Sequence, residues 1–107
     1  MSVTADGFVT VARVGDIPEG GCKIVRVDDQ SVAIYLVDGA YYAIDDICTH
    51  DGGPLAEGPL EGTVVECPRH GARFDIRTGE VLAAPATVPV PTYAVRVDGD
   101  QIQIGWA

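Results

Sequence analysis

Hydrophobic and polar residues alternate along much of this 107-residue chain. The stretches FVTVARV at 8–14 and CKIVRV at 22–27 have period-two patterns rich in β-branched residues, which predict strands. The apolar run VAIYLV at 32–37 predicts a third strand, and an Asp-Gly pair at 38–39 is a hairpin signal that joins it to YYAI at 41–44. The first part of the chain is therefore expected to be antiparallel β structure.

The regular pattern stops between residues 45 and 60, where glycine and proline are frequent, as in a loop that carries function. A strand is predicted again at 62–67 (GTVVEC), and RFDI at 73–76 leads into a turn that completes another hairpin. The segment 81–92 contains three prolines, so we expect an extended edge segment or a loop and not a central strand.

The chain closes on YAVRV at 93–97, the turn DGD and QIQI at 101–104, which together predict a final hairpin. No stretch has a convincing helical period and no repeat is visible. The predicted class is an all-β antiparallel sandwich or barrel. The length predicts one domain that spans residues 1–107.

The formal net charge is −9, from 16 acidic and 7 basic residues, which argues against a nucleic-acid partner because phosphates are contacted mainly by Lys and Arg. The N-terminal residues lack the basic and apolar regions of a signal peptide. The longest apolar run is far shorter than the ~20 residues of a membrane-spanning helix. We therefore expect a cytoplasmic protein without a membrane partner, in which three cysteines bind metal or remain reduced.

Both histidines and two of the three cysteines occur in two short motifs. Cys48 and His50 form Cys-X-His, and after sixteen further residues Cys67 and His70 form Cys-X-X-His. A hairpin between the motifs would bring four ligands together, as a tetrahedral zinc site requires. Zinc fingers usually pair Cys with Cys and His with His, whereas the mixed motifs here suit a binuclear centre with thiolates on one metal and imidazoles on the other.

The segment CTHDGGPL…CPRHGARFD at 48–75 resembles the Rieske [2Fe–2S] signature in spacing and in flanking residues. The resemblance implies one [2Fe–2S] cluster, with Cys48 and Cys67 on one iron and His50 and His70 on the other. It also implies the Rieske fold, an antiparallel base with a cluster-binding subdomain of two loops at about residues 45–85.

Departures from the respiratory and photosynthetic Rieske proteins bear on the redox potential. Those proteins have a disulfide that braces the two loops, at positions that match Gly53 and Arg69 here. They also have a serine and a tyrosine that donate hydrogen bonds to cluster sulfurs, and Ala72 and Phe74 stand at the matching positions. Without those hydroxyl donors the reduced cluster is less stabilised, so we expect a potential at the low end of the Rieske range.

The resemblance implies a monomeric electron carrier between a flavoprotein reductase and a terminal aromatic-ring oxygenase, which it would dock transiently. Both histidines are used by the cluster, so no catalytic mononuclear iron site is expected. The alternatives are a small Rieske-like subunit of a nitrite reductase and a structural zinc module. Cys22 is expected to be a core or edge residue, and Pro85 is either the proline of a third loop over the cluster or an ordinary loop proline.

Overall fold

The computed structural model describes residues 7–49 and 52–106, and within these ranges it contains ten strands and no helix. The strands are β1 (Val9–Arg13), β2 (Cys22–Val27), β3 (Gln30–Val37), β4 (Ala40–Asp45), β5 (Leu60–Glu61), β6 (Val64–Glu66), β7 (Arg73–Asp75), β8 (Val81–Ala83), β9 (Thr92–Asp98) and β10 (Gln101–Trp106). Neighbouring strands pair antiparallel throughout. The all-β prediction is confirmed.

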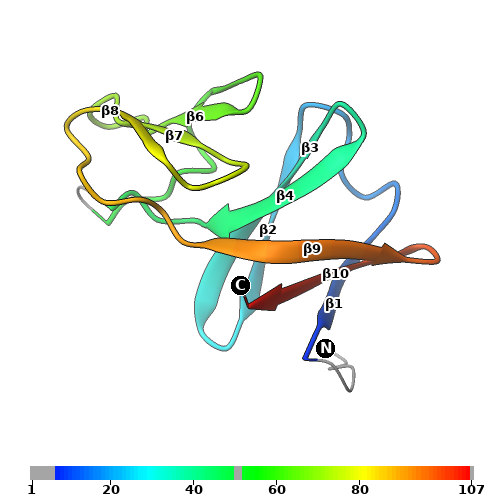
Figure 1. Cartoon of the computed structure of the whole chain (residues 1–107). Coiled ribbons are helices and arrows are strands. Elements are labelled where there is room, and N and C mark those ends of the chain that lie inside the picture. Colours follow the sequence, from blue (N-terminus) through cyan, green and yellow to red (C-terminus); the bar gives the residue numbers. More distant parts are fainter. Residues whose placement is uncertain (1–6, 50–51, 107) are drawn as a thin grey trace.

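Six of the strands form one sheet, here called the base, in the order β1-β10-β9-β4-β3-β2. Its two halves are joined where β4 pairs with β9, through Ala43 opposite Tyr93. The edge strands β1 and β2 send Ala12 and Val25 into the same hydrophobic core, so the sheet curves around its own apolar face (Figure 1). This geometry agrees with the predicted sandwich or barrel.

Two base hairpins turn through pairs of residues with positive φ. These are Asp28 and Asp29 between β2 and β3, and Asp38 and Gly39 between β3 and β4. Positive φ at both central positions is the geometry of a type I′ turn, whose twist matches that of paired strands. The Glu19 carboxylate accepts hydrogen bonds from the backbone amides of Asp38 and Gly39, at 2.6 and 3.0 Å, and holds the second turn in place.

Strand β3 is buried on both faces from Val32 onward, which explains the continuous apolar run at 32–37. Ile34 lies in the base core, whereas its neighbours Ala33 and Tyr35 lie in a second core on the other side of the strand. Successive side chains of a strand point to opposite faces. The second core is shared with the smaller sheet, so β3 is the layer between the two.

Strands β5, β6, β7 and β8 form a four-stranded sheet in that order, here called the small sheet. It lies at one end of the molecule, beyond β3 and β4 (Figure 1). Val65 and Phe74 pair across β6 and β7 and are fully buried in the second core. Strand β6 begins two residues later than the sequence predicts, because Gly62, with φ +62°, belongs to the preceding turn.

Candidate metal centre

Two loops carry the Cys-His motifs, and they close in the same way. In the first, the Cys48 amide donates to the Gly53 carbonyl at 2.6 Å, and the Gly52 amide donates to the Cys48 carbonyl at 2.7 Å. In the second, which connects β6 to β7, the Cys67 amide donates to the Ala72 carbonyl at 2.7 Å, and the Gly71 amide donates to the Cys67 carbonyl at 3.1 Å. The sequence offsets are identical in both loops.

A glycine in the left-handed region makes each loop possible. Gly52 has φ +78° and Gly71 has φ +81°, a conformation that other residues adopt with strain. Each glycine is four residues beyond its cysteine, where the chain must turn back toward the strand. The matched closure presents the two cysteines in equivalent backbone settings.

The cysteines point into the protein. Cys48 and Cys67 are each 1% exposed and belong to the same hydrophobic cluster, the second core. Leu55, Ala72 and Phe74 of that cluster are fully buried and form part of its apolar wall. Thiolates in such a setting are shielded from water, so a positive partner such as a metal ion is needed to stabilise their charge.

The histidine of the second loop lies on the outside. His70 is exposed, as are Pro68 and Arg69 before it. Of the predicted ligands, the structure therefore describes a buried pair of thiols and one exposed imidazole, whereas His50 lies outside the described residues.

A third segment, residues 84–91 between β8 and β9, lies beside these loops. Ala86 and Val90 are buried in the second core together with the two cysteines, whereas Pro85 is exposed. The hydroxyl of Thr49 in the first loop donates to the Val88 carbonyl at 2.6 Å. Sequence reasoning singled out Pro85 and missed Thr49, whose partner lies 39 residues away.

The residues expected to lower the redox potential lie where they can influence the site. Ala72 and Phe74 are both fully buried in the cluster that contains the cysteines. Neither side chain has a hydroxyl to donate, so this part of the wall is apolar. Gly53 is buried at the closure of the first loop and Arg69 is exposed on the second.

Cys22 is separate from this centre. It begins β2 opposite Tyr35 of β3, and its thiol approaches the Ala56 carbonyl at 4.0 Å. Partial burial, and then the nearby Asp46 carboxylate, raise the pKa of the Cys22 thiol. Burial is also the main cause that raises the pKa of Tyr35, so both groups stay protonated near neutral pH. Of the two settings expected for Cys22, core or edge, the structure has the second, because β2 is an edge strand and Cys22 is exposed.

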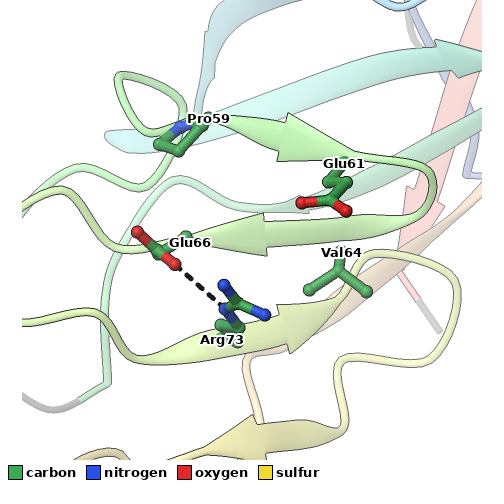
Figure 2. A pocket seen from close by; sticks show the side chains of 5 residues that line it. All are labelled: Pro59, Glu61, Val64, Glu66 and Arg73. Carbon is green, nitrogen blue, oxygen red and sulfur yellow. Dashed lines mark hydrogen bonds and ion pairs between the residues drawn. The ribbon is translucent and has the colours of Figure 1, made fainter.

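The surface of the described residues also has hollows. One of about 140 Å³ lies over β5, β6 and β7 and is lined by Pro59, Glu61, Val64, Glu66 and Arg73 (Figure 2). Across it, the Arg73 guanidinium pairs with Glu66 at 2.9 Å. Within residues 7–49 and 52–106, no three His, Cys, Asp or Glu side chains converge as ligands of one metal ion. A binuclear cluster needs only two protein ligands on each iron.

Comparison with known proteins defines the class. The family model of the Rieske [2Fe-2S] domain matches residues 7–94. The chain therefore belongs to the Rieske [2Fe–2S] family, whose cofactor is one [2Fe–2S] cluster. No helix in the described ranges is long and apolar enough to cross a membrane.

Similar proteins within that family include ferredoxins. The ferredoxin component of the naphthalene 1,2-dioxygenase system of Pseudomonas aeruginosa is 43% identical over 97 residues, which cover 91% of this chain and 93% of that protein. The ferredoxin of carbazole 1,9a-dioxygenase from Nocardioides aromaticivorans IC177 superposes with a TM-score of 0.88 at 33% identity, covering 94% and 98%.

A further solved structure contains a partner. It is the complex of reduced oxygenase and oxidised ferredoxin in carbazole 1,9a-dioxygenase. One chain of that complex superposes on the present protein with a TM-score of 0.86 at 35% identity, and the match covers 92% of each of the two chains. Like these relatives, the present protein is a ferredoxin, an electron carrier and not a catalytic subunit.

Proposed function

We propose that this ferredoxin passes single electrons from a flavin-dependent reductase to the terminal oxygenase of an aromatic-ring dioxygenase system. The observation that carries the proposal is the pair of buried thiols, Cys48 and Cys67, behind the exposed imidazole of His70. Electrons that arrive at such a site leave through its imidazole side, where a partner can approach. The ferredoxin components of naphthalene and carbazole dioxygenases support the choice of partner.

The proposed ligands are Cys48 and Cys67 for one iron and His50 and His70 for the other. The donor set fits the group, because the thiolates lie in an apolar wall and the described imidazole is outside it. When bound, the cluster supplies a one-electron couple. We propose that about residues 45–85 form the cluster-binding subdomain of a single domain that spans residues 1–107.

The surroundings of the thiols favour a low redox potential. With two thiolates and two neutral imidazoles the oxidised cluster has no net charge, and reduction makes it anionic. The buried side chains of Ala72 and Phe74 have no hydroxyl to stabilise this charge. We expect a midpoint potential at the low end of the Rieske range of about −150 to +300 mV.

The docking face is proposed to surround His70. Leu82 of β8 and Val88 of the segment 84–91 are 46% and 55% exposed, and Ile47, next to Cys48, is 42% exposed. Residues 81–92 contain no charged side chain. A small face of this kind suits transient contact with the oxygenase, as a carrier that exchanges partners requires.

The test of the cofactor and its ligands is spectroscopic. We expect purified protein to contain two irons per chain, with an EPR signal that appears on reduction by dithionite. Cys67→Ser and His70→Gln should lose this signal, whereas the matched control Cys22→Ser should keep it. A protein that is colourless, or that binds zinc and is silent in both states, would refute the proposal.

The test of the partner is electron transfer. We expect the reduced protein to deliver electrons to an aromatic-ring oxygenase and to be reduced again by its flavoprotein reductase. The protein is proposed to act as a free monomer in the cytoplasm, where an odd number of cysteines is compatible with reduced thiols. Stable copurification with a large nitrite reductase subunit would instead favour the role of a permanently bound redox subunit.

A further inference from the structure

The neck of the second loop is the last residue pair of the hairpin formed by β6 and β7. Here Glu66 of β6 lies opposite Arg73 of β7. Directly beyond this pair, the Cys67 amide donates to the Ala72 carbonyl and closes the loop. The hairpin has only three pairs of residues, so few backbone bonds set the width of the neck. A change at the neck is therefore passed directly to the loop that carries Cys67 and His70.

The two side chains at the neck form an ion pair. The Arg73 guanidinium donates to the Glu66 carboxylate at 2.9 Å, and Figure 2 shows the pair joining the two strands at the end where they enter the loop. The side chain of Arg73 is 51% exposed and that of Glu66 is 35% exposed. The pair borders the hollow described above, so water and salt reach it and salt can screen its charges.

Glu66 is also the point where the end of the first loop meets the small sheet. Its amide donates to the Pro59 carbonyl at 3.0 Å, and an added Cβ at Gly58 would lie 1.8 Å from its carbonyl oxygen. On the other side of the neck, Arg73 is the register partner of Ala83 in β8. The ion pair thus joins the strand that contacts the first loop to the strand that continues toward β8.

We propose that Glu66 and Arg73 are positioning residues, whose ion pair holds the neck of the second loop together and slows the loss of the cluster. The inference rests on the proposed ligand set, in which that loop supplies Cys67 and His70. Opposite charges that face each other across paired strands favour the pairing by a factor of about two to five. Because the pair is exposed, salt weakens it, and the cluster is therefore retained better at low ionic strength.

The test is a double-mutant cycle on the loaded protein. Glu66→Gln and Arg73→Gln each remove one charge, and a third variant combines the two substitutions. A fourth variant exchanges the charges by combining Glu66→Arg with Arg73→Glu. The matched control is Arg13→Gln, which removes the exposed ion pair between Arg13 and Asp100 in the base. The measurements are the midpoint potential and the rate at which the ferrous chelator bipyridyl bleaches the cluster, at about 0.01 M and about 1 M salt.

At low salt we expect each single variant to bleach about two- to fourfold faster than the wild type. The combined variant should bleach about as fast as either single one, because the same interaction is lost. The exchanged variant and Arg13→Gln should remain within about twofold of the wild-type rate. At about 1 M salt the differences from the wild type should disappear.

The midpoint potential separates the ion pair from a simple effect of charge. At low salt it should rise in Glu66→Gln, which removes a negative charge near the cluster, and fall in Arg73→Gln, which removes a positive one. Bleaching, in contrast, should become faster in both. A common direction in bleaching together with opposite directions in potential is what a paired contact at the neck predicts.

Three results would overturn the proposal while leaving the ligand assignment intact. Bleaching rates that move in opposite directions in the two single variants would show that net charge acts and not the pair. Wild-type bleaching in both would show that the pair does not hold the neck. An exchanged variant as labile as the single ones would show that the native side chains matter for another reason.

Loss of the cluster from both single variants has a defined meaning as well. It supports the inference when the exchanged variant retains the cluster, and overturns it when that variant loses the cluster too. By contrast, a wild-type protein that binds no cluster would refute the proposed function itself, before any variant is compared.

Discussion

The base and the small sheet hold together by different means. Base strands are five to eight residues long, several are joined by local hairpins, and they enclose a hydrophobic core without cysteine. Strands of the small sheet have only two or three residues, and the second core that they help to form contains two cysteines. We therefore expect the base to fold from its own sequence and the small sheet to depend on what its loops bind.

The largest effect should come from removing the cluster. Metal binding at such a site is coupled to local folding, so we expect protection from hydrogen exchange at Val65 and Phe74 to fall by about 100-fold or more in the apoprotein. Amides of β3 such as Ile34 should keep most of their protection. Equal loss in both regions, measured by exchange with NMR detection, would show that the two sheets fold as one unit.

The next largest effect should come from a substitution at a close backbone contact. Gly58 of the first loop packs against β6, where an added Cβ would lie 1.8 Å from the Glu66 carbonyl oxygen. Gly58→Ala must displace the backbone, so we expect a loss of about 3 kcal/mol in the free energy of unfolding.

The matched control for this substitution is Gly99→Ala in the last base hairpin. Gly99 has φ +63° and open space around it, so this change should cost about 1 kcal/mol from conformation alone. Urea unfolding of both loaded variants provides the comparison. Similar losses would mean that the loop accommodates a side chain by moving, and that its contact with β6 is not tight.

The docking face can be compared with an equally apolar position on the base. Leu82 near the loops and Ile24 on β2 are 46% and 48% exposed. We expect Leu82→Asp to slow electron transfer to the oxygenase by about tenfold, because it places a charge in the contact, without a change in EPR signal. Ile24→Asp should transfer electrons at the wild-type rate in stopped-flow measurements, and an equal slowing would place the contact elsewhere.

The smallest effect concerns the wall around the thiols. Ala72→Ser adds a hydroxyl at a fully buried position of the second core, and we expect the potential to rise by about 40 mV, the equivalent of one net hydrogen bond. Ala12→Ser makes the same change in the base core and should leave the potential unchanged. Redox titration followed by optical spectroscopy measures the potential of both variants. A fall in potential for Ala72→Ser would contradict the expectation that a hydroxyl in this wall stabilises the reduced cluster.

Sequence patterns predict the base well because its information is local. The strand Cys22–Val27 has the predicted limits, and the Asp-Gly pair at 38–39 forms the predicted turn. The pattern does not predict which distant strands pair, such as β1 with β10 and β4 with β9. Those contacts depend on how the whole sheet curves, which alternation in one strand does not report.

At the site, the spacing of the motifs predicts the ligand residues but not their setting. The matched closure of the two loops depends on backbone bonds, and its sign in the sequence is a glycine four residues beyond each cysteine, Gly52 and Gly71. The bond from Thr49 to Val88 joins an ordinary threonine to a carbonyl far along the chain. Such contacts become visible only when the second core brings the segments together. The assignment of Cys48, His50, Cys67 and His70 as ligands stays a prediction.

The pairing of β1 with β10 places the first and last strands side by side, with Val9 opposite Ile104. Both strands belong to the base, remote from the small sheet (Figure 1). A fluorescent label or an electrode tether attached to β1 or β10 would leave the two Cys-His loops exposed to solvent and partners. The protein could therefore be immobilised on an electrode in one defined orientation.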